Sequence, residues 1–281
     1  IAFCLVILGL ASTFFYSLRA YYTDPKYARY DWRGAVARLE SSSLPSEAVI
    51  LNGPPWLPEF DYYFRGTLPR YELPRPGLRG QPEIETELRG AAAAHTGLWL
   101  VKYYPPDFDP DGVVELWLAE HAFRASGDWV ENATFSFYSL PQSGLSTTIP
   151  VGAQFGEGII LQEARLSRVP ARMGSLLQLT LVWRATQSVT EDYTVFAHLV
   201  TEDGNLVSQR DGPPVGGYRP TSGWDQGDVV EDRVALVIPQ AAPASPFAVQ
   251  VGLYRSADGS RLPAVGGPSG GGPDFAALPA P

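Results

Sequence analysis

The fold of the first half of the chain is decided by residues 97–123, GLWLVKYYPPDFDPDGVVELWLAEHAF. Residues 97–102 form a short apolar run that is typical of a buried strand. Over residues 109–123 the apolar side chains recur at helical spacing, and Asp109 followed by Pro110 is typical of a helix start. A strand that leads through a turn into a helix is the unit from which α/β sheets are built.

The same alternation of strand and helix extends to both sides of this stretch. We predict helices at residues 31–39, 56–64, 83–94 and 109–123, and strands at residues 48–51, 71–73, 97–102 and 134–140. Helices that alternate with short apolar strands indicate a small α/β domain, Rossmann-like, with helices packed on the faces of the sheet.

After Pro141 the hydrophobic periodicity changes from 3.6 to 2, and Gly- and Pro-rich turns separate the apolar runs. The predicted strands are residues 159–166, 176–183, 193–200, 206–210, 229–238 and 247–254. Short antiparallel strands in this number predict a β-sandwich. The expected organisation is therefore the end of a transmembrane helix (1–20), an α/β domain (21–141), a linker (142–150) and a β-sandwich domain (151–281).

The transmembrane prediction rests on residues 1–18, IAFCLVILGLASTFFYSL, which contain no charge. A run of this length crosses most of a hydrocarbon core of roughly 30 Å. Aromatic residues followed by Arg19 are typical of a membrane interface. A cleaved signal peptide and a buried core helix remain alternatives. We therefore expect the chain to be a fragment, the tail of a larger membrane protein that contacts the lipid bilayer.

Composition excludes some classes of function. The formal net charge is −9, which disfavours a nucleic-acid partner because phosphate binding needs a basic surface. The single cysteine, Cys4, lies within the predicted span, so no disulfide can form within the chain. The three histidines are far apart in the sequence, so we predict no metal site and no cofactor.

One group of aromatic residues is a candidate substrate-binding site. Trp56, Asp61, Tyr62 and Tyr63 follow the first predicted strand, at the edge where open α/β sheets place ligands. Aromatic faces beside a carboxylate can hold a sugar by stacking and hydrogen bonding. Packing against a membrane domain would require the same residues, so both interpretations stay open.

The second candidate group lies in the long loop of residues 211–227, which contains Tyr218 and Trp224. A loop of this length in a sandwich is often a binding loop. Its Pro and Gly content also fits a rigid structural crossover, and the sequence alone does not decide between the two.

Several stretches resemble the C-terminal part of bacterial GT-C membrane glycosyltransferases of family 39, the protein mannosyltransferase and aminoarabinose transferase type. The stretches are DWRGAVARLE (31–40), AVILNGPPW (48–56), FDYYF (60–64), LWLVKYY (98–104), VVELWLAEHAF (113–123) and, in the sandwich, YTVFAHLVTEDGNLVSQRDGPPVGG (193–217). The resemblance covers nearly the whole chain, but these stretches are not active-site motifs.

The resemblance implies an enzyme that moves a sugar from a polyprenyl-phosphate carrier, a lipid-linked sugar, to an acceptor outside the cytoplasm. In that class the catalytic carboxylate lies in an early loop that this chain does not contain, so no catalytic residue is assigned. The resemblance also implies that the folded part is extracytoplasmic, anchored at the cell membrane and packed on the upstream transmembrane domain. The basic residues after the span would favour the cytoplasm instead. The alternative function is a membrane-tethered module that binds carbohydrate or another cell-surface partner.

Overall fold

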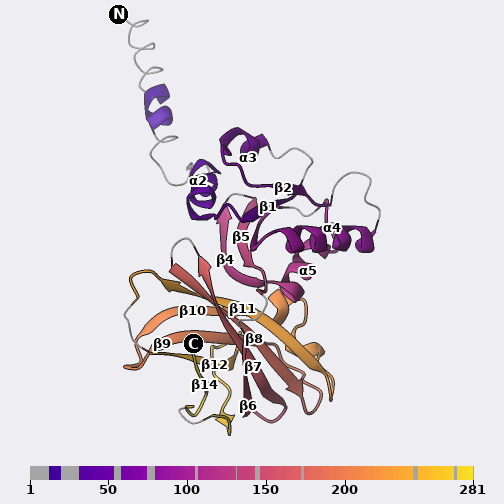
Figure 1. Cartoon of the computed structure of the whole chain (residues 1–281), viewed down its shortest axis with the longest axis vertical. Coiled ribbons are helices and arrows are strands. Elements are labelled where there is room, and N and C mark those ends of the chain that lie inside the picture. Colours follow the sequence, from indigo (N-terminus) through magenta and orange to yellow (C-terminus); the bar gives the residue numbers. More distant parts are fainter. Residues whose placement is uncertain are drawn as a thin grey trace, which may run out of the picture.

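The structure is a computed structural model (Figure 1). It describes residues 13–19, 32–53, 58–74, 80–104, 107–130, 132–142, 146–171, 174–242, 246–268 and 271–280. Most of the predicted span, residues 1–12, lies outside the described residues, whereas residues 13–19 are helical. Among the helices that the structure describes, none is both long enough and apolar enough to cross a membrane.

The α/β half is built on a mixed sheet. Strands β1 (Glu47–Asn52), β2 (Arg70–Glu72) and β3 (Gly97–Tyr103) are parallel, with β1 in the middle. Strand β5 (Ala133–Ser139) pairs antiparallel with β3, and β4 (Phe123–Val130) pairs antiparallel with β5. All six residues of β1 are buried, as expected for a strand covered on both faces.

Helices cover both faces of this sheet. Helices α2 (Trp32–Ser42) and α3 (Pro58–Tyr63) pack on one face, where Val36, Leu39 and Phe60 meet Val49 of β1. Helices α4 (Gln81–Ala94) and α5 (Val113–His121) pack on the other face in a second hydrophobic cluster. The predicted combination of an α/β half followed by a β-sandwich is consistent with this arrangement.

Both boundaries of one predicted helix are wrong. The helix expected over residues 109–123 spans only Val113–His121, because Ala122 is extended (φ −136°, ψ 170°) and β4 begins at Phe123. The N-cap residue is Gly112 and not Asp109, but the two carboxylate oxygens of Asp109 accept hydrogen bonds from the first backbone N–H groups of the helix, those of Val113 (2.9 Å) and Val114 (3.1 Å). Strand β4 was not predicted, because its sequence FRASGDWV contains a glycine and does not alternate clearly.

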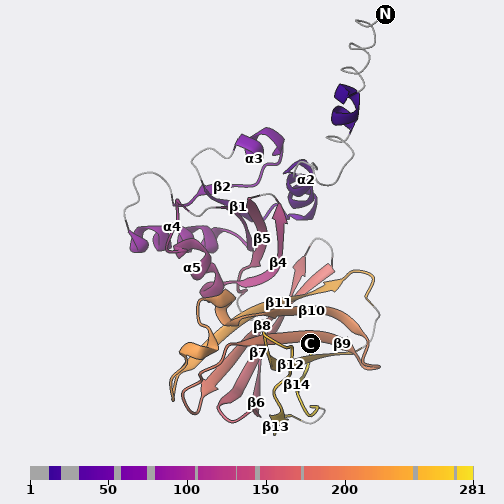
Figure 2. The ribbon, with the colours of Figure 1, turned by 180° about the vertical axis from the view of Figure 1, so that it is seen from behind.

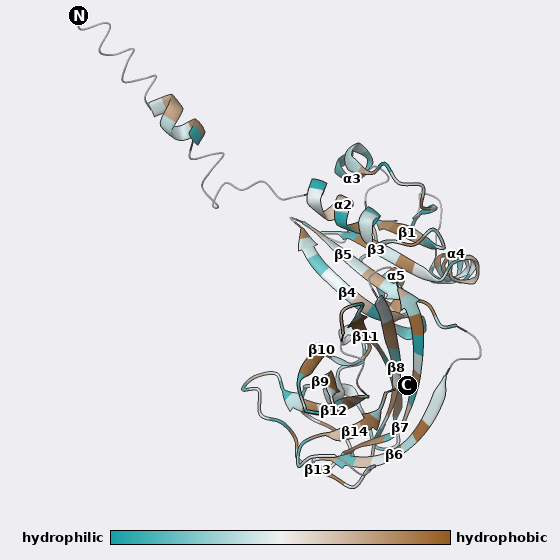
Figure 3. Cartoon of the chain, turned by 60° about the vertical axis from the view of Figure 1, so that its left-hand side comes forward, coloured by the Kyte–Doolittle hydropathy of each residue, from teal (hydrophilic) through white to brown (hydrophobic). Residues whose placement is uncertain are grey.

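The second half is a sandwich of two sheets (Figure 3). One sheet contains β6 (Thr147–Phe155), β7 (Ile159–Ala171), β8 (Gly174–Ala185), β11 (Val229–Pro239) and β13 (Ala264–Val265). The other contains β9 (Tyr193–Thr201), β10 (Leu206–Gly212), β12 (Phe247–Arg255) and β14 (Ala276–Pro279). The six predicted strands are present, whereas β6, β13 and β14 were not predicted.

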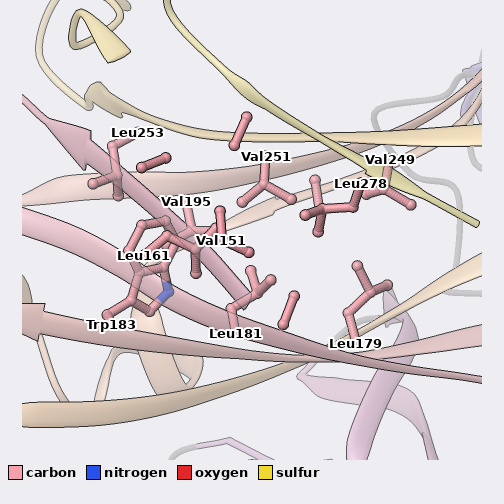
Figure 4. Packing of buried hydrophobic residues seen from close by; sticks show 14 of the residues in the cluster. Val151, Leu161, Leu179, Leu181, Trp183, Val195, Val249, Val251, Leu253 and Leu278 are labelled. Atoms are coloured by element: carbon pink, nitrogen blue, oxygen red, sulfur yellow. The ribbon is translucent and has the colours of Figure 1, made fainter. Parts of the chain in front are cut away.

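The sandwich core lies between these sheets. Figure 4 shows Leu161, Leu181 and Trp183 from the first sheet facing side chains of the second. The facing residues are Val195, Val249, Val251, Leu253 and Leu278. Trp183 is fully buried, so this contact excludes water along the centre of the sandwich.

The two halves share one sheet. Strand β11 pairs in parallel with β4 through Val234 and Arg124, so the larger sheet runs, over the described residues, in the order β13-β6-β7-β8-β11-β4-β5-β3-β1-β2. Figures 1 and 2 show that α2 and α3 lie at the end of this assembly away from the sandwich. Strand β6 begins at Thr147, inside the predicted linker 142–150.

Candidate functional site

The first candidate site lies around α3, and its aromatic residues divide into two sets. Phe60 and Phe64 are buried and stacked, with ring centroids 4.9 Å apart. Tyr62 and Tyr63 point away from the core, with exposed fractions of 69% and 36%, and contact each other edge to face. Trp56 lies outside the described residues. Phe60 and Phe64, which are four residues apart, therefore pack against the core on one side, and Tyr62 and Tyr63 between them remain accessible to a ligand or partner.

Asp61 forms an ion pair with Arg70 of β2. Both side chains are substantially exposed, and such pairs contribute little to stability. Arg70 also lies over the ring of Phe60, with its guanidinium carbon 5.6 Å from the ring centroid. The carboxylate of Asp61 is therefore engaged with an arginine, while the two tyrosines beside it remain available.

The second feature of this site is the end of the sheet at which β1, the strand before α3 in the sequence, finishes. We call the end of the sheet where β1, β2 and β3 finish the carboxyl edge. Asn52 and Lys102, the register partners near the ends of β1 and β3, lie there. Asn52 Nδ2 donates to the carbonyl oxygen of Leu73 (3.0 Å) and to Asp109 Oδ2 (3.0 Å). The segments that follow the three parallel strands therefore meet at this edge, as in other open α/β sheets.

The exposed aromatic side chains of the folded part belong to the α/β half. Among the described residues from Trp32 onward, the exposed Phe, Trp and Tyr side chains are Tyr62, Tyr63, Phe108 (44%) and Trp129 (65%). Phe108 lies between β3 and α5. Trp129 pairs with Thr134, which in turn pairs with Lys102 near the end of β3. Phe108 and Trp129 are therefore near the carboxyl edge, whereas Tyr62 and Tyr63 lie on α3, and the backbone N–H groups of Arg65 and Gly66 that follow them donate to Glu40 of α2. We call these four residues the exposed aromatics. The sequence analysis missed Phe108 and Trp129, because their proximity to this edge depends on the order of the strands.

The second candidate group, in the loop of residues 211–227, makes internal contacts. Trp224 is 1% exposed, belongs to the sandwich core, and donates from Nε1 to the carbonyl oxygen of Arg219 (3.1 Å). Thr221, fully buried, accepts from the backbone N–H of Tyr193 (2.8 Å) and donates to the carbonyl oxygen of Glu191 (2.6 Å). These contacts fix the loop to the sandwich and bury the Trp224 ring, so the ring is not accessible to a ligand.

Tyr218 of the same loop contacts the α/β half. Its hydroxyl donates to Glu115 Oε2 (3.3 Å), which also accepts from Lys102 Nζ (2.5 Å). Burial raises the pKa of Tyr218, and the charge of Glu115 and the hydrogen bond to it raise that pKa further. Burial lowers the pKa of Lys102, but the hydrogen bond and the charge of Glu115 outweigh it, and the net shift is upward. Lys102 is therefore charged and Tyr218 neutral at pH 7.

The three histidines lie in different places. His95 bonds the hydroxyl of Tyr71 (3.0 Å), His121 bonds the carbonyl oxygen of Trp117 (2.8 Å), and His198 bonds Asp211 (3.1 Å). Within the part of the chain that the structure describes, no group of three or more His, Cys, Asp or Glu residues is arranged to hold a metal ion.

Comparisons with known proteins give little guidance. No protein-family model matches the chain, and no curated protein matches it. A solved structure, the endonuclease/exonuclease/phosphatase from Beutenbergia cavernae DSM 12333, is similar at 13% sequence identity and a TM-score of 0.24. The similarity covers 66% of this chain and 57% of that chain, so this chain spans a little over half of that protein's length. A TM-score this low carries no argument about fold or activity.

Proposed function

We propose that the chain is the non-catalytic, extracytoplasmic region of a membrane glycosyltransferase that moves a sugar from a polyprenyl-phosphate donor to an acceptor. The resemblance of the sequence to family 39 GT-C enzymes suggests the class. The observation that supports the proposal is that, among the described residues from Trp32 onward, the exposed aromatics all belong to the α/β half and none to the sandwich. Exposed aromatic side chains concentrated on one surface are typical of an interaction site or a membrane interface.

The path of the chain supports the same orientation. Helix α2 packs on β1 and leads into it through a short turn, so α2 runs antiparallel to β1 and begins at the carboxyl edge. The residues that connect α2 to the predicted span, 20–31, reach at most about 40 Å when fully extended. If residues 1–18 lie in the bilayer, the carboxyl edge is the part of the folded region held closest to the membrane. The exposed side chains Phe14 and Tyr16 at the end of that segment suit an interface.

In this proposal the exposed aromatics contact the upstream transmembrane domain and the bilayer surface, and Tyr62 and Tyr63 line the entrance through which the lipid-linked sugar reaches the active site. An aromatic ring gives a sugar an apolar face to stack on, and the hydroxyl of tyrosine adds a hydrogen-bonding group. Catalysis belongs to residues outside this chain, and the described region positions the donor.

The test is sugar transfer by the full-length protein in membrane vesicles, measured per folded molecule with a polyprenyl-phosphate sugar as donor. We expect the double substitution Tyr62→Ala/Tyr63→Ala to lower transfer about 2- to 10-fold, the loss of two aromatic contacts. Leu206→Ala is the control, because Leu206 is equally exposed (55%) but lies in β10 of the sandwich.

Two results would contradict the proposal. Absence of transfer by the wild-type protein from polyprenyl-phosphate sugars would reject the assignment to this class, and glycan binding without transfer would favour the tethered binding module. Unchanged transfer per folded molecule in the double variant would reject the role of the two tyrosines.

A further inference from the structure

A cavity lies at the junction of the two halves. Its volume is about 140 Å³. Residues of α5, β4 and β5 line it from the α/β half, and residues of β10, β11 and the turn at Pro213 and Gly216 line it from the sandwich. Three arginines line it: Arg124 on β4, Arg210 on β10 and Arg233 on β11. Arg233 forms an ion pair with Glu231, so Arg124 and Arg210 are the two to account for.

Arg124 is incompletely paired. One terminal nitrogen, Nη2, donates to Ser136 Oγ (3.2 Å). Its Nε atom is buried and has no hydrogen-bond partner among the described residues. The described residues also provide no carboxylate within ion-pair distance of Arg124. Arg124 as a whole is half-buried, and a partly dehydrated guanidinium without a counter-charge is unfavourable, because buried charges are normally paired.

Arg210 also lacks a counter-charge within ion-pair distance among the described residues. Its side chain forms no ion pair or hydrogen bond with the residues that the structure describes. Burial lowers the pKa of Arg210 and the positive charge of Arg124 lowers it further, while Tyr138, Asp232 and Asp211 offset only part of this shift. Two guanidinium groups therefore repel each other across one partly dehydrated cavity. An anion between them would relieve this repulsion.

The acidic residues that line the cavity or flank it do not supply this anion. Glu115 is paired with Lys102, Asp211 with His198, and Glu231 with Arg233. Asp232 is the remaining carboxyl group. Its Oδ1 accepts from the backbone N–H of Val215 (2.8 Å). Burial raises the pKa of Asp232 to about 6, because its negative charge is less stable in this dehydrated position than in water. None of these carboxylates lies within ion-pair distance of Arg124 or Arg210 among the described residues.

We propose that this cavity binds one phosphoryl oxyanion between Arg124 and Arg210. Arginine presents a planar set of donors that matches the oxygens of a phosphate group. Tyr138 lines the same cavity and is 1% exposed. Burial raises its pKa, so its hydroxyl stays protonated and can donate to the anion. A cavity of roughly 150 Å³ holds a molecule the size of benzene, which is enough for a phosphate group and little more.

Because the lining comes from both halves, the bound anion would join the α/β half to the sandwich. The shared chemistry is a phosphoryl group, which inorganic phosphate, a sugar phosphate or the headgroup of a lipid phosphate can supply. The inference does not depend on the proposed transferase function, since it rests only on the charges and geometry of the cavity.

The experiment measures binding and thermal unfolding of the full chain with three probes: inorganic phosphate, a hexose 1-phosphate and a short-chain polyprenyl phosphate in detergent. We expect at least one probe to raise the unfolding temperature in a saturable way. Arg210→Gln and Arg124→Gln should each weaken binding about 10- to 100-fold, as the loss of charge-assisted hydrogen bonds predicts. The control is Arg184→Gln, which removes the same charge from an exposed position of β8 and should bind as the wild type.

The unliganded variants provide a second readout. If the arginines repel each other, Arg210→Gln without ligand should unfold at the same temperature as the wild type or higher. The proposal is overturned if none of the three probes binds, or if Arg184→Gln weakens binding as much as Arg210→Gln. It is also overturned if Arg210→Gln lowers the unfolding temperature while phosphate has no effect on the wild type, because Arg210 would then be a structural partner of Asp232.

Discussion

Gln178 of β8 donates a hydrogen bond from Nε2 to Ser139 Oγ of β5 over 2.8 Å, and this contact links the sandwich to the α/β half. The same nitrogen donates to the carbonyl oxygen of Leu140 (2.9 Å), and Gln178 Oε1 accepts from Ser167 Oγ (2.9 Å). Gln178 is 1% exposed, so the network is shielded from water. The side chain therefore satisfies buried polar groups in both halves at once.

We expect Gln178→Leu to destabilise the protein by about 2–4 kcal/mol, because it leaves buried polar partners without hydrogen bonds. The variant should also separate the unfolding of the two halves. Urea unfolding followed by far-UV circular dichroism and by tryptophan fluorescence measures both effects. Gln209→Leu, at an exposed position of β10, is the control. A change below about 0.5 kcal/mol with coincident transitions would mean that the network does not couple the halves.

A second prediction compares two tryptophans. Trp224 is buried in the sandwich core, whereas Trp129 is 65% exposed at the carboxyl edge. Trp224→Ala should cost about 3–5 kcal/mol because it leaves a cavity. Trp129→Ala should cost less than about 1 kcal/mol, mainly its contact with Tyr104. Denaturant midpoints of the two variants provide the measurement, and similar losses at both sites would contradict the assigned roles.

Asp232 gives a prediction about pH. Burial raises its pKa from 3.8 to about 6, so between these values the folded protein binds a proton that the unfolded chain releases. The resulting stabilisation is fully present below the unfolded value and is lost as pH rises through about 6. From pH 5 to 7.5 the wild type should lose about 1 kcal/mol relative to Asp232→Asn. Unfolding of both proteins at the two pH values measures this difference, and parallel pH profiles would show that Asp232 does not titrate as described.

The sequence predicted the fold where hydrophobic periodicity was strong. The buried run at Ala48–Leu51 and the alternating strands of the sandwich gave clear signals, and both are present. Strand β4 could not be predicted from its own composition, because it forms by pairing with β5 and β11. The end of α5 was placed too late because Ala122 and Phe123 continue a helical pattern that the sheet overrides.

The candidate site was predicted only in part, since burial is a property of the folded chain. The sequence identified Tyr62 and Tyr63 but could not distinguish the exposed tyrosines from Trp224, whose ring the sandwich core encloses. It gave no signal for the cavity between Arg124 and Arg210, because these residues come from strands that the fold brings together. Single charged residues on separate strands carry no local pattern.

The orientation of the carboxyl edge is the central claim, and site-directed labelling tests it most directly. A full-length background in which Cys4 and any cysteine outside this chain are replaced by serine permits one environment-sensitive dye at a time at Tyr62→Cys, Phe108→Cys or, as control, Leu206→Cys. The measurement is dye quenching by headgroup spin-labelled lipids in vesicles that contain the full-length protein. We predict strong quenching at positions 62 and 108 and weak quenching at 206. Equal quenching at all three positions, or the strongest quenching at 206, would contradict the account.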